Sequence, residues 1–222
     1  LSDNGVDHAL LQLAAMHVGL PASPISPAYS LLSQDHAKLR EIAAMLRPSA
    51  IYAIDGDLFA KAFAAIDLDV PHVTTRNPPA KRRGVTIDDL VKTSPGRGVD
   101  ESFSAVGPDT IGKVLFTSGS TGAPKGVINT QRMMCSNQEA IAQLWPFLGE
   151  RPPVVVDWLP WSHTFGGNHN FNMVLRHGGT LYVDAGKPVP GRIEETVRNL
   201  REIACTMYFN VPRGFDALLP FL

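Results

Sequence analysis

The sequence has few cysteines, and those present match no known ligand or disulfide spacing. Cys135 and Cys205 are far apart in a chain of 222 residues and form neither a Cys-x-x-Cys pair nor a zinc motif. A disulfide framework and a metal site are therefore not expected. We expect both cysteines to be free thiols that are buried in the core.

Long apolar runs and an excess of one charge are also lacking. No apolar stretch reaches the roughly 18 to 20 residues that cross a bilayer, and no basic segment leads into a signal-peptide core. The 20 basic and 21 acidic side chains give a formal net charge of -1. This balance offers no electrostatic basis for binding a nucleic acid or a membrane surface, so we expect a cytoplasmic protein with small-molecule ligands. Oligomeric state does not follow from the composition.

Apolar residues make up 44% of the sequence, enough for a substantial core, and they recur in alternating helix and strand patterns. The predicted helices of the first part are at 6–18, 34–46 and 58–65, and the predicted strands are at 50–54 and 72–74. Ser33 is the predicted N-cap of the second helix. This alternation is typical of an α/β fold with a largely parallel sheet.

Residues 76–110 interrupt the pattern, because proline, glycine and charged residues dominate NPPAKRRG and TSPGRGVDES. Only TIDDLVK predicts a short helix there, and we interpret the stretch as a variable surface connection. The alternating pattern then resumes. The predicted strands are at 112–116, 126–129, 154–157, 180–183 and 206–209, and the predicted helices are at 131–145, 168–176 and 193–203.

The predicted fold class is therefore α/β, with layered αβα subdomains and largely parallel sheets. Residues 1–75 are expected to form a first α/β part, and 76–110 the variable connection. Residues 111–222 are expected to form a second α/β part.

Residues 117–126, TSGSTGAPKG, lie between two predicted strands and combine residue types that suit a polyphosphate. The glycines permit positive φ and let phosphate oxygens approach backbone N–H groups; they are Gly119, Gly122 and Gly126. Hydroxyl groups add further donors, on Thr117, Ser118, Ser120 and Thr121. Lys125 adds a mobile positive charge suited to β- and γ-phosphate oxygens, and Pro124 stiffens the turn before it.

Two other interpretations of this loop are weaker. A Walker A loop requires serine or threonine straight after its lysine and a helix that begins there, whereas Gly126 and a strand pattern follow Lys125. A flexible glycine–serine linker would not need the lysine, the proline and the hydroxyl groups together. We therefore predict a loop that binds the phosphates of ATP.

The loop TSGSTGAPKG resembles the signature loop of the adenylate-forming superfamily, which includes acyl-CoA synthetases, adenylation domains of nonribosomal peptide synthetases, and luciferases. The resemblance implies a two-step reaction that uses ATP, Mg2+ and coenzyme A. A carboxylate attacks the α-phosphate of MgATP to give an acyl-adenylate and pyrophosphate, and a thiol then displaces AMP. It also implies that Lys125, as a catalytic residue, and the loop hydroxyls hold the β- and γ-phosphates while pyrophosphate leaves.

A second segment, VDWLPWSHTFGG at 156–167, resembles the superfamily motif in which an apolar strand ends in a proline and a histidine precedes a glycine. The resemblance implies that His163 is catalytic, beside the substrate carboxylate or the thiol entrance. It would act there as a neutral hydrogen-bonding group or as a cation. The implied acid pocket is lined by Trp158, Trp161, His163, Phe165, Gly166 and Gly167. The alternative is that the aromatic residues belong to the core.

Several polar residues lie close after this segment. His169 and His177 lack metal-ligand spacing from His163 and are expected to be surface or structural residues. The asparagines at 168, 170 and 172 either line the site or cap the helix that follows, and we favour capping for Asn168.

Most of the chain outside 76–110 resembles feruloyl-CoA synthases and related aromatic acyl-CoA synthetases, notably over WLPWSHTFGGNHNFNMVLRHGGTLYVDAGKPVPG. This implies activation of a hydroxycinnamate such as ferulate to its CoA thioester. The alternatives are an acyl-CoA synthetase for another aryl or medium-chain acid, a nucleotide-binding module without catalysis, and an incomplete fold that binds nothing. The superfamily's later motifs and its small C-terminal domain are absent from the sequence. We therefore expect an incomplete part of the large N-terminal domain, inactive by itself.

Overall fold

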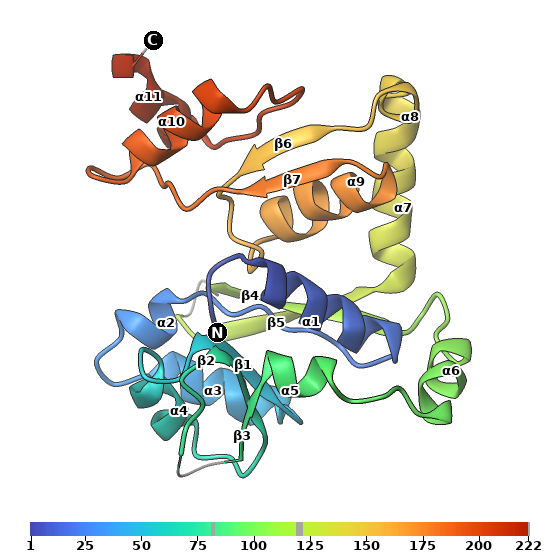
Figure 1. The fold of residues 1–222 in the computed structure, drawn as a ribbon, viewed down its shortest axis with the longest axis vertical. Coiled ribbons are helices and arrows are strands. Elements are labelled where there is room, and N and C mark those ends of the chain that lie inside the picture. The colour runs from blue at the N-terminus through green and yellow to red at the C-terminus, as the bar shows by residue number, and fades with distance from the viewer. Residues whose placement is uncertain (81–82, 119–121, 222) are drawn as a thin grey trace. The chain divides into compact units, whose positions relative to one another are not determined.

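The computed structural model describes residues 1–80, 83–118 and 122–221. It divides the chain into two compact units, Leu1–Gln131 and Arg132–Leu222. Each unit contains helices and a parallel sheet, so the α/β class predicted from the sequence is confirmed (Figure 1). No helix in the described ranges combines the length and the hydropathy of a bilayer-spanning segment.

A three-stranded parallel sheet forms the centre of the first unit. Its strands are β1 (Ile51–Asp55), β2 (His72–Arg76) and β3 (Gly84–Thr86), in that order, and the third was not predicted. Two helices, α3 (Ala37–Leu46) and α4 (Ala60–Ile66), supply apolar side chains to the core below it. The buried residues of this core include Leu39, Ile42, Ile51, Phe59 and Phe63.

The start of α3 differs from the prediction by almost one turn. His36 adopts a left-handed conformation with φ 53°, so the helix begins at Ala37 and Ser33 is not its N-cap. The Ser33 hydroxyl instead accepts a hydrogen bond from the His36 N–H at 3.0 Å. The Asp35 carboxylate accepts one from the Ala37 N–H at 3.1 Å, which holds the pKa of Asp35 below its ordinary value.

The remaining helices of the first unit are α1 (Val6–His17), α2 (Ala28–Leu31), α5 (Ile87–Val91) and α6 (Arg97–Ser104). The short helix predicted in TIDDLVK is confirmed as α5, whose capping box joins Thr86 and Asp89. The sequence did not predict α6, because the glycine and proline residues around it read as a loop.

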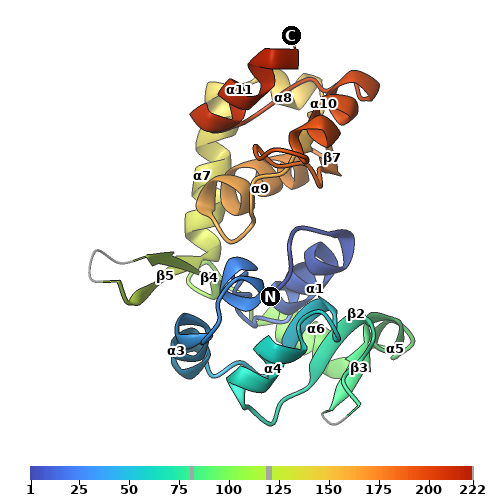
Figure 2. The ribbon, with the colours of Figure 1, turned by 90° about the vertical axis from the view of Figure 1, so that its left-hand side faces the viewer.

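An antiparallel hairpin completes the first unit. Its strands are β4 (Ile111–Ser118) and β5 (Pro124–Thr130), drawn as the antiparallel pair in Figure 2, and β5 contacts α3. The other edge of β4 makes a parallel bridge with Ala22, where the Ala22 N–H donates to the Gly112 carbonyl at 2.9 Å. This bridge joins the hairpin to the segment that follows α1.

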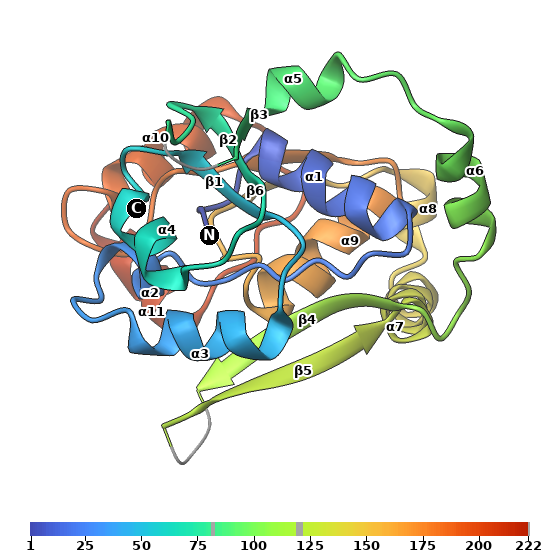
Figure 3. The ribbon, with the colours of Figure 1, turned by 90° about the horizontal axis from the view of Figure 1, so that it is seen from below.

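The second unit is built around the parallel strands β6 (Val154–Asp157) and β7 (Thr180–Val183), whose predicted bounds are confirmed. The predicted strand at 206–209 is a single bridge between Met207 and Val155. The helices are α7 (Gln131–Leu144), α8 (Phe147–Glu150), the π-helical turn η1 (Phe165–Asn170), α9 (Phe171–Arg176), α10 (Ile193–Glu202), α11 (Pro212–Leu218) and η2 (Leu219–Phe221). Figure 3 gives a second view of these elements.

The core of the second unit lies between β6 and its helices. Its buried members are Ile141, Leu148, Val155, Met173 and Val174. Cys135 is exposed on α7 and Cys205 is only half-buried, so the prediction of two buried thiols was wrong. The apolar face of α7 is instead filled by Met134 and Ile141.

Candidate functional site

The hairpin presents the described part of the predicted phosphate loop. Thr117 pairs directly with Lys125, and Ser118 with Pro124. Because directly opposite residues of an antiparallel pair project from the same face, the hydroxyl of Thr117 and the ammonium of Lys125 share one face of the hairpin. Both residues are exposed. Gly119, Ser120 and Thr121 lie outside the described residues.

Two glycines of this loop have different structural roles. Gly122 has φ +82°, a backbone conformation that residues with a side chain rarely adopt. This agrees with the expectation that the loop needs positive φ. Gly126 pairs with Phe116, and a β-carbon on it would lie 3.2 Å from Val114 Cγ1 and 3.5 Å from the Phe116 ring. Gly126 therefore lets the hairpin pack closely, while its role in nucleotide binding stays a prediction.

The aromatic and histidine segment begins where β6 ends. The indole N–H of Trp158 donates to Asn210 Oδ1 at 3.2 Å. Trp161 is only 2% exposed and packs against Phe171, with ring centroids 4.7 Å apart. His163 is exposed, so its imidazole is accessible from outside the segment.

The glycine pair of this segment lies against the segment's own backbone. A β-carbon on Gly166 would stand 2.4 Å from the Leu159 carbonyl oxygen, and one on Gly167 would stand 2.4 Å from the Trp161 carbonyl oxygen. The sequence predicted a close approach at both positions. The partner that the structure shows is the preceding turn of the chain.

The helix predicted at 168–176 has a different beginning. Residues Phe165–Asn170 form the π-helical turn, and α9 follows from Phe171, so Asn168 does not cap a helix. Asn168 lies inside the turn, where its side-chain amide donates to Thr164 Oγ1 at 3.2 Å and its main-chain carbonyl accepts from Gln138 Nε2 at 2.7 Å. π-Helical turns are rare and are frequently found at functional sites.

His169 lies within an aromatic cluster. Its ring centroid is 5.1 Å from that of Phe209, 5.4 Å from that of Phe165 and 5.9 Å from that of Trp145, each with edge-to-face geometry. The sequence indicated a surface or structural residue, and the structure shows it half-buried. The cluster could not be predicted, because its members come from segments far apart in the chain.

Two buried carboxyl groups lie at the carboxyl ends of β6 and β7, Asp157 as the last residue of β6 and Asp184 directly after β7, and sequence reasoning missed both. Asp157 is 2% exposed, and burial raises its pKa to about 6, against hydrogen bonds from the Leu159 N–H and Asn170. Asp184 is 5% exposed and accepts hydrogen bonds from Thr196 Oγ1 at 2.6 Å and from the Gly186 N–H at 2.8 Å. Carboxyl ends of parallel strands are common ligand sites, and this was the available signal.

Tyr208 lies near these carboxyl groups. Burial, with a smaller contribution from the charge of Asp184, raises the pKa of Tyr208 to about 12. The Asn210 amide donates to the Tyr208 hydroxyl at 2.9 Å. This hydroxyl is therefore neutral at physiological pH and acts as a hydrogen-bonding group.

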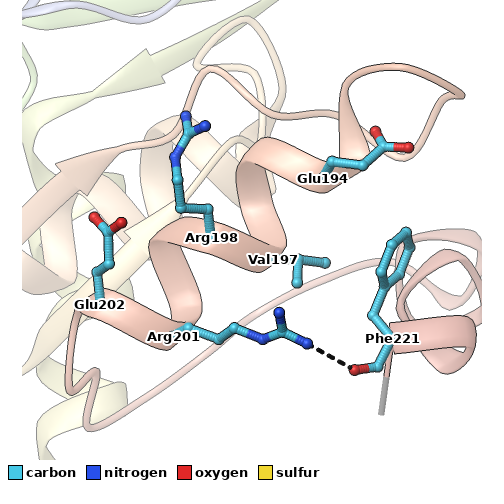
Figure 4. Close-up of a pocket in the computed structure, with 6 residues that line it drawn as sticks. All are labelled: Glu194, Val197, Arg198, Arg201, Glu202 and Phe221. Atoms are coloured by element: carbon cyan, nitrogen blue, oxygen red, sulfur yellow. Dashed lines mark hydrogen bonds between the residues drawn. The ribbon is translucent and has the colours of Figure 1, made fainter.

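A separate pocket of about 390 Å³ lies along α10, away from the predicted residues (Figure 4). It is lined by Glu194, Val197, Arg198, Arg201, Glu202 and Phe221. Arg201 closes one side by donating to the Phe221 carbonyl at 3.3 Å. None of the predicted site residues lines this pocket, and we assign it no part in nucleotide or acid binding.

The described residues thus group the predicted side chains in two places, the hairpin in the first unit and the segment after β6 in the second. The exposed lysine and hydroxyl of the hairpin fit an anionic polyphosphate. Within the described ranges, no group of three or more histidine, cysteine, aspartate or glutamate side chains could hold a metal ion.

This chain matches one protein family and is similar to several curated proteins. The sequence model described as AMP-binding enzyme matches residues 1–222. The long-chain-fatty-acid–AMP ligase FadD23 of Mycobacterium tuberculosis (strain CDC 1551 / Oshkosh) is 29% identical over 175 residues, which is 75% of this chain and 27% of the relative. The 3-hydroxybenzoate–CoA ligase of Aromatoleum sp. (strain CIB) is 30% identical over 154 residues, 68% of this chain and 27% of the relative.

A solved structure shares the fold. It is a malonyl-CoA ligase ternary product complex with methylmalonyl-CoA and AMP bound. It matches with a TM-score of 0.68 and 24% identity, over 98% of this chain and 41% of that one. The chain thus spans about a quarter of the length of the two curated relatives.

Proposed function

The chain belongs to the AMP-binding enzyme family, and we propose on this premise that it carries the phosphate loop and part of the acid pocket of an ATP-dependent acyl-CoA ligase. The observation that carries the proposal is the pairing of Thr117 with Lys125, which presents a hydroxyl and an ammonium on one exposed face beside the loop. An ordinary strand connection has no need of this arrangement.

The proposed reaction has two steps. A carboxylate oxygen attacks the α-phosphorus of ATP, the bond to the β-phosphate oxygen breaks, and pyrophosphate leaves. The thiol of coenzyme A then attacks the acyl carbon and AMP departs. In the first step Lys125 and Thr117 would stabilise the negative charge that develops on the leaving pyrophosphate. Bound Mg2+ would neutralise part of the same charge.

His163 is proposed to lie beside the substrate carboxylate or the entrance for the thiol. Its exposed imidazole projects from a turn whose backbone is held by hydrogen bonds, so it can meet a carboxylate or a thiol that enters the site. Phe165 and Trp158 would form apolar walls nearby, with Gly166 and Gly167 allowing the compact turn. The structure supports Trp161 as packing beneath this surface, since its ring is buried against Phe171. Its contact with the acid stays a prediction.

An aromatic acid of the hydroxycinnamate class, such as ferulate, is the proposed substrate. The aromatic side chains at Trp158 and Phe165 and the cluster around His169 support a planar acid. One relative is a ligase for 3-hydroxybenzoate, whereas another is a ligase for long-chain fatty acids. The alternative is therefore an enzyme for another aryl acid or for a medium-chain acid.

The test is ATP–pyrophosphate exchange with ferulate, 3-hydroxybenzoate and octanoate as separate substrates. It should be run on the protein as the cell produces it and on a preparation of residues 1–222. Exchange above the no-acid background with ferulate supports the proposal, and a stronger signal with octanoate would replace ferulate by an aliphatic acid. Calorimetric binding of ATP without exchange for any acid would instead indicate a nucleotide-binding module.

A further inference from the structure

We propose that Asp157 and Asn170 are positioning residues, whose mutual hydrogen bond closes the segment that carries His163 and fixes its place in the proposed acid site. The inference rests on the proposed function, because it concerns the position of His163 in the proposed acid site. It concerns residues that neither the phosphate loop nor the acid pocket uses directly.

The bond joins the two ends of the segment. Asp157 is the last residue of β6, and Asn170 is the last residue of the π-helical turn. Asp157 Oδ2 accepts a hydrogen bond from Asn170 Nδ2 at 3.1 Å, and Asp157 Oδ1 accepts one from the Leu159 N–H at 3.0 Å. The two side chains are 2% and 0% exposed, so water does not compete for the bond.

The backbone inside the segment holds His163 relative to these ends. The His163 N–H donates to the Pro160 carbonyl at 3.0 Å, and the His163 carbonyl accepts from the Gly167 N–H at 2.8 Å. Because both main-chain groups are bonded within the segment, His163 moves with it as one body. The orientation of that body relative to β6 then depends on the bond between Asp157 and Asn170.

The same bond determines which ring nitrogen of a second histidine, His169, carries the proton. An ionised carboxylate only accepts hydrogen bonds, so the Asn170 amide must turn its NH2 group toward Asp157. Its oxygen then faces His169 Nδ1 at 2.8 Å, which requires the proton of His169 to be on Nδ1. The lone pair of the ring is left on Nε2, within the aromatic cluster of Phe165 and Phe209.

Packing alone does not explain an aspartate at this position. Burial and the like charge of Asp184 both oppose ionisation of Asp157, while the Leu159 N–H and Asn170 support it. An apolar or amide side chain of similar size would avoid the cost of burying the charge. A carboxylate at position 157 is accounted for by its effect on the orientation of the Asn170 amide.

The test compares three variants of the native polypeptide. Asp157→Asn leaves one oxygen where two accept hydrogen bonds. When that oxygen keeps the Leu159 N–H, the new NH2 group faces the NH2 group of Asn170, so the Asn170 amide rotates and the His169 tautomer reverses. In the double variant Asp157→Asn with Asn170→Asp, the donor and acceptor exchange places, and the new carboxylate at position 170 again accepts from His169. Asp184→Asn is the comparison variant: it removes a second buried carboxylate of the same unit, which holds the segment around Gly186 and Thr196 and whose like charge acts on Asp157, but it leaves the bond between Asp157 and Asn170 in place.

Exchange kinetics give the first readout. We expect Asp157→Asn to raise KM for the acid or lower kcat by roughly 10- to 100-fold, with KM for ATP within about 2-fold of the original, because a small misplacement of reacting groups has effects of this size. The double variant should recover most of the loss. Asp184→Asn should lower the melting temperature without this selective change. Equal kinetics in Asp157→Asn and the original protein, or no recovery in the double variant, would overturn the proposal.

A second readout does not depend on activity. Hydrogen–deuterium exchange of peptides covering 158–171 should quicken in Asp157→Asn and return in the double variant, and long-range proton–nitrogen NMR should show the His169 proton moving between ring nitrogens. If these changes occur while no acid supports exchange, the positioning role stands and the proposed function fails. If exchange of 158–171 is unchanged, the positioning role fails by itself.

Discussion

Gly166 lies so close to Leu159 that a β-carbon on the glycine would stand 2.4 Å from the leucine carbonyl oxygen. Neither residue can move aside easily, because the atom that the β-carbon would meet belongs to the main chain, and the hydrogen bond from Asn170 to Asp157 holds the turn against β6. The closeness of these two residues makes the segment around His163 compact, and it leads to the first prediction.

Gly166→Ala should destabilise the protein by roughly 2 kcal/mol or more, since the added methyl group must displace main-chain atoms in a packed region. Gly149→Ala is the matched control, because a β-carbon there would meet nothing within 4 Å. That variant should be neutral or stabilising by up to about 1 kcal/mol. Urea unfolding of both variants measures the difference. Equal midpoints for the two would show that the turn relaxes freely.

Lys125→Ala should impair the release of pyrophosphate more than the binding of the acid. Removing a positive charge from a developing phosphate anion typically costs roughly 100-fold in rate. Lys61→Ala is the control, since Lys61 is an exposed lysine of α4 in the same unit. Rapid-quench measurement of adenylation, with the acid dissociation constant measured separately, makes the comparison. Unaltered adenylation kinetics would remove Lys125 from the phosphate site.

Asp157 should give stability a distinct pH dependence. Its folded pKa of about 6 lies above the ordinary 3.8, so its contribution to stability is fully present below about pH 4 and is lost as pH rises through about 6. The free energy of unfolding of the original protein minus that of Asp157→Asn should therefore fall by up to about 3 kcal/mol across this window. Urea titrations of both proteins from pH 4 to above pH 7 test this. A constant difference would mean that the pKa is not raised.

Phe165→Ala should change the preference among acids, because this half-buried ring contacts His169 and Phe209 edge-to-face. The ratio of kcat/KM for ferulate to that for octanoate is expected to change by roughly 10-fold or more. An unchanged ratio would remove Phe165 from the pocket.

Trp161→Ala is expected to act differently. Its ring is 2% exposed and packs on Phe171, so the substitution should destabilise the protein by about 3–5 kcal/mol through the cavity that it leaves. Thermal unfolding measures this. A small change in melting temperature with a large change in acid preference would return Trp161 to the pocket lining.

Elements with a strong local signal were predictable from the sequence. The run of valines in β6 starts after two prolines, and β-branched residues favour a strand, so its predicted bounds agree with the structure. The predicted bounds of β7 also agree, and this strand starts directly after Gly178 and Gly179. The helix α10 carries charged residues opposite a narrow apolar face, and its periodicity located it within one residue of its end.

Elements that depend on distant contacts were not predictable. Nothing local shows that His36 takes a left-handed conformation, or that the turn at 165–170 winds as a π-helix. In the candidate site, the roles of the loop glycines and of His163 are predicted from their pattern in the sequence and stay predictions. The bond between Asp157 and Asn170 depends on a reversal of the chain that only the folded segment provides.

The ladder between β4 and β5 has a consequence for protein engineering. Both ends of the phosphate loop are anchored by residues that pair with each other, Ser118 with Pro124 and Thr117 with Lys125. Because these paired residues belong to β4 and β5 themselves, the sequence between Ser118 and Pro124 can be replaced by that of a relative without redesigning either strand. Grafts of this kind would separate the contribution of the predicted phosphate loop from that of the rest of the chain.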